Sequence, residues 1–336
     1  MAATIKDICL KTGLGLATVS KYLNGGNVLE KNRTAIEKAI KDLDFHANAF
    51  ARGMKTGKSH AVGAVIHDMT NLFATRILRV MSDELKQHGY SMIVSDSRGD
   101  AEYEKECTSF LLGKMVDGIV NIPVTSKCDH LIPAISRGIP IVLIDRRVDG
   151  VSLDTVIADN HDAAYSATKR FIGAGHENIG ILAGPDNIYT SIERLDGYFD
   201  ALLDAGITSG RMYVADGGFS LKDGYNSTKR LVSTYPELTA LFSTNYEMTL
   251  GMLIALNELG KSIPDDISVI GFDNMDLCRI VRPSLSIVSQ PIDDIAMSAV
   301  QLLLRRLKGE DPPAETIVMK TRLIDGGSVK DIAKGS

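Results

Sequence analysis

The chain has 336 residues, of which 44% are hydrophobic and 24% charged, and its formal net charge is −5. This is an ordinary globular composition, and the length suggests two or three domains. No apolar run approaches the roughly 18 residues of a membrane-spanning helix, and the N-terminus lacks the basic start and apolar core of a signal peptide, so we expect neither.

Charge is distributed unevenly along the chain. Residues 1–58, called the head below, contain ten Lys/Arg and five Asp/Glu, a net +5, which leaves −10 for the rest. A basic head on an acidic body favours contact between the head and a polyanion such as DNA. Small basic segments are common, so this asymmetry is weak evidence by itself.

The four cysteines, Cys9, Cys107, Cys128 and Cys278, lie far apart and form no C-x-x-C pair. This spacing argues against zinc and against a disulfide framework, and it fits a reduced compartment. We therefore interpret each cysteine as a small buried hydrophobe and predict no metal, no cofactor and a cytoplasmic location.

Three short amphipathic helices are predicted in the head, because apolar residues recur there at spacings of three and four. These residues are Ile5, Ile8 and Cys9, then Val19, Tyr22 and Leu23, then Ile36, Ala39, Ile40 and Leu43. Gly13 and Gly15 bracket a tight turn between the first two helices, as in a helix-turn-helix unit that places its second helix in the DNA major groove.

The second predicted helix has an outward face formed by Leu16, Ala17, Ser20, Lys21 and Asn24. Lys21 can donate to guanine or phosphate, and Ser20 and Asn24 suit phosphates or base edges. Leu16 and Ala17 can contact a thymine methyl group. Leu16 could equally belong to the core of so small a domain.

From Ala61 onward, short apolar runs alternate with helical patterns, the first two helices being expected near 73–88 and 101–113. The runs fall at 61–66, 90–94, 118–122, 140–145, 179–184, 212–215, 239–243 and 267–272. Such continuous apolar strands indicate parallel sheets covered on both faces. About ten strands are more than one open sheet usually takes, so we expect two sheets with a cleft between them.

Polar residues follow several of these strands, at the edge where ligands gather in doubly wound sheets. They are Asp68, Asp96, Asp145, Thr244, Asn245 and Asp273. Any one of them would ordinarily be a solvated loop residue, whereas several converging from both sheets would form a site.

Catalytic and phosphate-binding motifs fail on inspection. The stretch 13–18 begins like G-x-G-x-x-G but ends in Thr and follows no strand, and both Gly-Lys-Ser triplets lack the first P-loop glycine. No nucleophile elbow, H-E-x-x-H or paired histidines occur. We therefore predict that the chain is not an enzyme and has no catalytic residues.

The chain resembles the lac repressor (LacI/GalR) family of bacterial transcription regulators, in the family's order and over nearly its whole length. The matching stretches are T-I-K-D-I at 4–8, A-T-V-S-K-Y-L-N-G at 17–25, A-F-A-R-G-M at 49–54, A-D-N-H-D-A-A at 158–164, G-H-E-N-I-G-I-L-A-G-P at 175–185, E-R-L-D-G-Y at 193–198, I-P-D-D-I-S-V-I-G-F-D-N at 263–274 and R-P-S-L-S-I-V-S-Q-P at 282–291.

This resemblance implies an α/β protein with an all-α helix-turn-helix head and a periplasmic-binding-protein-like core of two doubly wound parallel-sheet subdomains. It implies a DNA-binding domain at 1–47, a hinge helix and linker at 48–58, and an effector-binding and dimerisation core at 59–336. The N-subdomain would cover about 59–160 and 293–322, and the C-subdomain about 161–290.

The resemblance also implies the DNA contacts. Major-groove contacts map onto Leu16, Ala17, Ser20 and Lys21, phosphate contacts onto Thr4, Thr18 and Asn24, and hinge contacts onto Asn48, Ala51, Arg52, Met54 and Lys55. Met54 stands where the family has a leucine that wedges into the minor groove, and a thioether side chain can also wedge. Ala47, Gly15 and Leu29 replace a usual Pro and two usual Ser residues, and these departures leave the operator affinity open but not the fold.

The family's effector pocket maps onto Asn71, Phe73, Asp145, Arg194, Asn245, Asp273 and Gln290. Two carboxylates, an amide and a guanidinium could hydrogen-bond a polyol, and the Phe73 ring offers a flat apolar face for a sugar. Two alternatives remain for Arg194: an ion pair with Asp145 or Asp273, or recognition of a base, as in a purine-binding relative.

The sequence thus predicts a sequence-specific transcription regulator, a repressor that binds a pseudo-palindromic operator in double-stranded DNA as a homodimer under control of a sugar effector. No leucine-heptad tail follows Leu323, which favours a dimer over a tetramer. One alternative is a catabolite-control-type regulator with a phosphocarrier protein as corepressor. Another is a sugar-binding protein without a DNA role. The effector, the operator and the choice between induction and corepression stay open.

Overall fold

The computed structural model describes residues 3–23, 26–45, 58–208, 212–273 and 275–333, and it divides into two compact units, Met1–His60 and Ala61–Ser336. The described residues of the smaller unit form three helices, α1 (Ile5–Thr12), α2 (Leu16–Leu23) and α3 (Glu30–Asp42). Thr4 and Asp7 form a capping box that starts α1, and Gly13 ends it in the left-handed conformation, at φ 67°. The predicted three-helix head is confirmed.

The core of the head is small, and it contains every apolar residue of the three predicted stripes. Ile8, Val19 and Ile36 are fully buried at its centre, one from each helix. Leu16 is 57% exposed, so the alternative that assigned it to this core is wrong. Leu16, Ala17 and Lys21 on the outward face of α2 are exposed.

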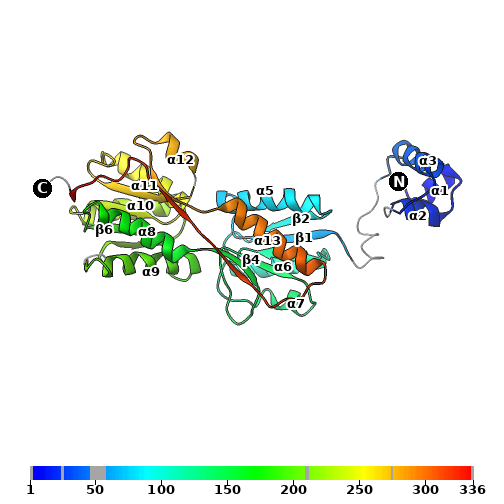
Figure 1. The fold of residues 1–336 in the computed structure, drawn as a ribbon, viewed down its shortest axis with the longest axis horizontal. Coiled ribbons are helices and arrows are strands. Elements are labelled where there is room, and N and C mark those ends of the chain that lie inside the picture. The colour runs from blue at the N-terminus through cyan, green and yellow to red at the C-terminus, as the bar shows by residue number, and fades with distance from the viewer. Residues whose placement is uncertain (1–2, 24–25, 46–57, 209–211, 274, 334–336) are drawn as a thin grey trace. The chain divides into compact units, whose positions relative to one another are not determined.

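The larger unit is built on two six-stranded sheets, which confirms the predicted pair of doubly wound sheets (Figure 1). The first has the order β11-β5-β4-β3-β1-β2 and the second β12-β10-β9-β8-β6-β7. All described pairs are parallel except β10 with β12. The first sheet comprises β1 (Ala61–Ile66), β2 (Ser91–Asp96), β3 (Gly118–Asn121), β4 (Ile141–Ile144), β5 (Asp154–Ala158) and β11 (Thr316–Met319). The second comprises β6 (Ile179–Gly184), β7 (Val214–Asp216), β8 (Ala240–Ser243), β9 (Ser268–Phe272), β10 (Ser286–Ser289) and β12 (Arg322–Ile324).

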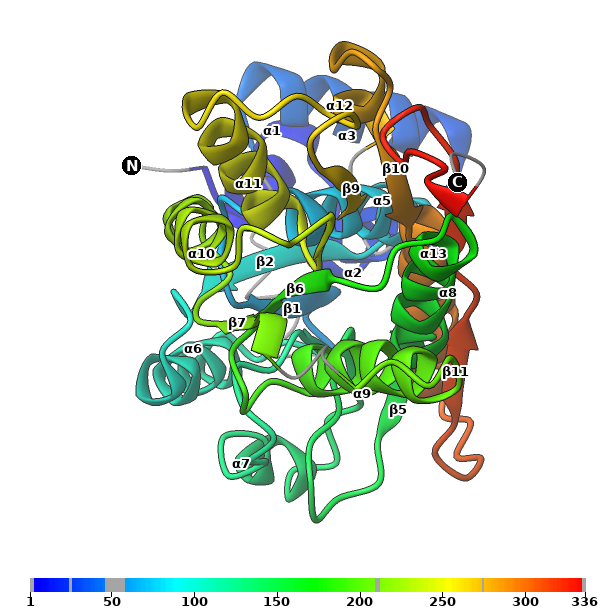
Figure 2. The same ribbon diagram turned by 90° about the vertical axis from the view of Figure 1, so that its left-hand side faces the viewer.

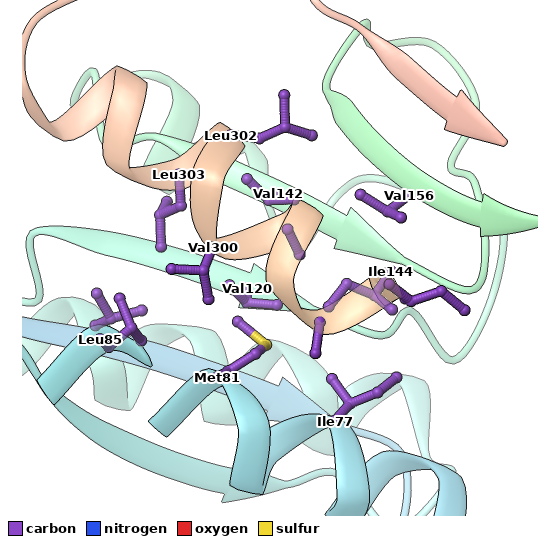
Figure 3. Close-up of a cluster of buried hydrophobic side chains, with 14 of the residues drawn as sticks. Ile77, Met81, Leu85, Val120, Val142, Ile144, Val156, Val300, Leu302 and Leu303 are labelled. Carbon is purple, nitrogen blue, oxygen red and sulfur yellow. The ribbon is translucent and has the colours of Figure 1, made fainter. Parts of the chain in front are cut away.

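Helices cover both faces of the first sheet. On one face lie α5 (Leu72–Gln87) and α13 (Ile292–Leu307), and on the other α6 (Ala101–Gly113) and the short α7 (Ile132–Ile135). Figure 3 shows the first of these interfaces, where side chains of α5 and α13 meet those of the strands. The labelled residues are Ile77, Met81, Leu85, Val120, Val142, Ile144, Val156, Val300, Leu302 and Leu303.

The second sheet is covered in the same way. The pair α8 (Asn160–Gly173) and α9 (Tyr189–Leu203) packs on one face, and the pair α10 (Leu221–Thr234) and α11 (Tyr246–Glu258) on the other. Figure 2 shows the two pairs flanking β6. A short helix, α12 (Met275–Ile280), precedes β10. Among the described residues, no helix is long and apolar enough to cross a membrane.

The chain passes between the two sheets three times, after β5, after β10 and after β11. The segment after β10 returns to the first sheet, where α13 packs and β11 pairs with β5, and the chain then crosses to β12 in the second sheet. The tail beyond β12 lies with the second sheet, since Val329 joins its core and the Ile332 N–H donates to the Ala174 carbonyl at 2.8 Å. The sequence assigned no subdomain to this tail.

All eight predicted apolar runs form strands, whereas β5, β10, β11 and β12 were not predicted. The last two are half-exposed edge strands, and their apolar runs are only two or three residues long. The other two strands are buried, but each is short and begins with a polar residue, Asp154 or Ser286.

We predict that Gly197→Ala in α9 destabilises the core. A Cβ at this position would collide with the His161 carbonyl of α8, so the two helices would have to separate. The expected loss in free energy of unfolding, measured by urea denaturation, is about 1–3 kcal/mol. Gly113→Ala at the end of α6 is the matched control, because its Cβ meets no atom within 4 Å. Equal stability of the two variants would contradict this account of the α8–α9 contact.

Candidate effector cavity and DNA-binding surface

Polar side chains at the carboxyl ends of both sheets line one cavity of about 930 Å³. All seven residues assigned to the effector pocket lie in its wall: Asn71, Phe73, Asp145, Arg194, Asn245, Asp273 and Gln290. They come from both sheets, from α9 and from the N-termini of α5 and α11. The cavity is large enough for a small ligand.

Two aspartates occupy equivalent places in the two sheets. Asp145 follows β4 and Asp273 follows β9, each the third strand in its sheet order. Both have a left-handed backbone, at φ 69° and 57°, and each donates its N–H to a carbonyl of the next strand, Val156 at 2.9 Å or Val288 at 2.7 Å. Strained non-glycine backbone of this kind clusters at ligand sites. Each sheet thus brings one buried carboxylate to the cavity.

Arg194 lies on α9 and is 4% exposed. Its Nε donates to the Asn160 Oδ1 at 2.8 Å, its Nη1 donates to the Thr244 carbonyl, and its guanidinium lies 3.9 Å from the Phe272 ring centroid. It forms no ion pair within 4.0 Å with either cavity aspartate, all three side chains being described. The ion-pair alternative for Arg194 is therefore wrong in this structure, and its Nη2 donates to no described residue.

Asp273 is held by Gln290, whose Nε2 lies 3.1 and 3.0 Å from the two carboxylate oxygens. Burial raises the pKa of Asp273 to about 6, against the opposing effects of Arg194 and Gln290. The Gln290 Oε1 is buried and accepts no hydrogen bond from the described part of the chain. An unsatisfied buried acceptor is costly, so this oxygen is suited to a ligand hydroxyl.

The two asparagines of the set line the cavity, but their amides are already engaged. Asn71 caps α5, accepting from the Ala74 N–H at 2.9 Å, and its Nδ2 donates to the Glu247 Oε1 at 3.0 Å. Asn245 caps α11 in the same way, accepting from the Met248 N–H at 2.8 Å, and its Nδ2 donates to the Phe219 carbonyl at 2.9 Å. Both residues shape the cavity more than they offer free hydrogen-bonding groups.

The cavity is also lined by residues that were not assigned from the sequence, among them His67, Arg146, Phe219 and Glu247. Glu247 bridges the two halves of the core, since its second oxygen accepts from the Asn245 Nδ2 at 3.1 Å, and burial raises its pKa. Burial lowers the pKa of His67 to about 4, which keeps the imidazole neutral. Arg146 directly follows Asp145 in the sequence, and this position at a strand end is a signal for a cavity residue. The other three carry no sequence signal, because only the fold brings them to the cavity.

In the head, the α2 residues Ala17, Thr18 and Lys21 line a shallow groove with residues 27–30, 32 and 33. Leu16, Ala17 and Lys21 are exposed, and Ser20 is half-buried. The Thr4 hydroxyl donates to the Asp7 carboxylate at 2.7 Å. The other assigned DNA contacts, Asn24, Asn48, Ala51, Arg52, Met54 and Lys55, lie outside the described residues, as does most of the hinge.

Residues 4–48 match the family described as bacterial regulatory proteins, lacI family, and residues 168–329 match the periplasmic binding protein-like domain. The HTH-type transcriptional repressor PurR of Proteus mirabilis (strain HI4320) is 30% identical over 333 residues, which cover 98% of this chain and 97% of the relative. The chain belongs to the lacI family. As a lacI-family protein it is a DNA-binding transcription regulator and not an enzyme, as predicted.

Solved structures of similar proteins agree with this lacI-family fold. The transcriptional regulator CelR in complex with cellobiose has a TM-score of 0.74 and 26% identity, over 97% of this chain and 99% of that one. The lac repressor dimer bound to operator and the anti-inducer ONPF has a TM-score of 0.88 at 22% identity, over 98% and 100% of the two chains. The predicted fold class is confirmed.

We predict that Asp273→Asn raises the melting temperature at pH 7.5 but not at pH 4. The folded protein holds this proton more tightly than the unfolded chain, because the pKa rises from 3.8 to about 6 on folding. The free energy of unfolding therefore falls as pH rises through that interval. Thermal melts across pH 4–8 test this. Asp83→Asn, on an exposed position of α5, is the control. A lower melting temperature for Asp273→Asn than for the wild type at pH 7.5 would refute the claim that the ionised Asp273 carboxylate destabilises the folded protein.

Proposed function

We propose that this lacI-family protein is a cytoplasmic, homodimeric repressor that binds a pseudo-palindromic operator through two heads. We further propose that a small hydroxyl-rich effector, a sugar, binds the cavity and controls operator affinity. The arrangement of two buried carboxylates, one from each sheet, around a guanidinium with a free Nη2 supports this proposal most strongly.

The cavity chemistry suits neutral hydroxyl groups. Asp145 and Asp273 can each accept from a hydroxyl, the Gln290 Oε1 can accept another, and Arg194 can donate. Phe73 and Phe219 supply apolar ring faces in the same wall. Six carboxylates and four guanidiniums line the cavity, which disfavours a phosphorylated ligand. The cellobiose complex of the relative CelR supports a sugar.

Control of DNA binding would follow from a ligand held by both halves of the core. Asp145 belongs to the first sheet, whereas Asp273 and Arg194 belong to the second, so an effector bound to all three favours one angle between the halves. Such coupling is typically worth about 1–3 kcal/mol. The hinge assigned to residues 48–54 is too short to be a stable helix alone, so we propose that it orders on the operator.

We predict that Lys21→Ala weakens DNA binding by about 1–3 kcal/mol if it contacts a guanine, or lowers the salt dependence by about one unit of slope if it contacts a phosphate. Gel-shift titrations against genomic fragments at several KCl concentrations distinguish these results. Lys41→Ala, an exposed lysine on α3, is the control with the same charge change. Unaltered affinity and salt slope for Lys21→Ala would count against α2 as the DNA-reading helix.

We predict that Arg194→Ala abolishes the thermal shift that sugars cause in the wild type but leaves DNA binding intact. Arg194→Lys, which keeps the charge but not the fork of donors, should recover the shift only in part. The assay is a melting-temperature screen against sugars and nucleosides. Arg137→Ala on the surface of the same subdomain as Asp145 is the control. A full ligand response in Arg194→Ala would remove this residue from the site.

A further inference from the structure

One carboxylate is buried behind the cavity wall rather than in it. Glu104 lies on α6 and is 1% exposed, although a glutamate is rarely buried without a partner. Its Oε1 accepts from the Asn121 Nδ2 and from the Val124 N–H, both at 3.1 Å. These contacts fasten α6 to the segment that follows β3, and they leave a buried negative charge whose cationic partner must be found elsewhere.

The cation that acts on this charge is Arg146, which does line the cavity. Its side chain is 8% exposed, and its Nη1 donates at 2.8 Å to the carbonyl of Pro123, the residue before Val124. Its Nε lies 3.4 Å from the Asp145 Oδ2. Burial lowers the pKa of Arg146, and the two carboxylates of Asp145 and Glu104 both oppose that effect. Arg146 therefore lies beside a cavity carboxylate and is linked to a hidden one through the Pro123–Val124 peptide.

We propose that Glu104 is a positioning residue for the effector cavity: Arg146 and Glu104 bind opposite ends of the Pro123–Val124 peptide, and from that side the Glu104 carboxylate attracts the Arg146 guanidinium, so it sets how far Arg146 neutralises Asp145. With Glu104 ionised, Arg146 is divided between two anions, and Asp145 keeps lone pairs for a ligand hydroxyl. With Glu104 uncharged, Arg146 turns to Asp145 alone and competes with the ligand for it. The inference rests on the proposed function only in treating Asp145 as an effector contact.

The hidden carboxylate can change charge near neutral pH. Burial raises the pKa of Glu104 to about 7, against the opposing effects of the Val124 N–H and of Arg146. No described residue places a full positive charge within 4.0 Å of the Glu104 carboxylate, because Arg146 lies farther away and burial lowers the pKa of His130, 3.5 Å from the Oε1, to about 4 and so keeps it neutral. Asp129 and Lys105 act on His130 with opposite signs. Affinity for a sugar is therefore expected to fall as pH drops through 7.

The test follows Arg146 directly and needs no effector. In protein labelled with ¹⁵N-arginine, the Nε–Hε resonance of Arg146, assigned with Arg146→Lys, is recorded from pH 5.5 to 8.5. In the wild type it should shift with one inflection near pH 7, at the same pH as the ¹³C-labelled Glu104 carboxyl. In Glu104→Gln, which keeps the Oε1 acceptor but removes the charge, the inflection should vanish.

Glu102→Gln is the matched control. Glu102 lies on the same helix, but it is exposed and pairs with Lys105 at 2.7 Å, so its removal should leave the Arg146 titration unchanged. A flat wild-type Arg146 resonance over this pH range would overturn the proposal without any variant, as would an unaltered inflection in Glu104→Gln.

A second measurement separates this proposal from the proposed function. Cellobiose and D-ribose are titrated into the wild type and into Glu104→Gln at pH 6 and pH 8. The wild type should bind the recognised sugar roughly 3- to 10-fold more weakly at pH 6, and the variant should bind equally at both. If neither sugar binds while Arg146 titrates with Glu104, the effector class is wrong and the positioning stands. If a sugar binds with the same pH profile in both proteins, the positioning is wrong and the effector class stands.

Discussion

The burial of both faces of both sheets is the constraint on which the rest of this core depends. Once helices cover a parallel sheet on each side, its strands carry mostly apolar side chains, and the polar groups gather at the strand ends. Asp145 and Asp273 show the result, because each follows the third strand of its sheet and each is turned by a left-handed backbone. Two separate sheets thereby present matching carboxylates to one cavity.

Burial also explains why the two buried guanidiniums of this cavity are held largely by neutral oxygens and not by simple ion pairs. A buried charge must be compensated, but a fully paired charge has nothing left for a ligand. Arg194 is held by the neutral oxygens of Asn160 and Thr244, and Arg146 by the Pro123 carbonyl, beside Asp145. Both guanidiniums are fixed in place without fully neutralising the aspartates.

The same contacts connect the cavity to the segments that join the two sheets. Asn160, which accepts from Arg194, is the first residue of α8 and follows the first crossing. Its neighbour Asp159 accepts from the Thr321 N–H at 2.7 Å, in the third crossing. A ligand that moves Arg194 therefore acts on a residue beside two of the three connections, which is where a change in angle between the halves has to occur.

Hydropathy patterns along the sequence were enough to determine the three-helix head and eight of the strands, because these depend on local apolar patterns. The number of apolar runs was enough to predict two sheets. Resemblance to the family, together with the rule for strand ends, placed all seven assigned pocket residues around one cavity. Only the tertiary structure decided that the Asn71 and Asn245 amides are engaged and that Arg194 pairs with neither aspartate. It also decided that Glu247 lines the cavity and that Glu104 is buried behind the cavity wall. Those facts depend on distances between residues far apart in the chain, such as the 3.0 Å from Asn71 to Glu247, and no local pattern carries them.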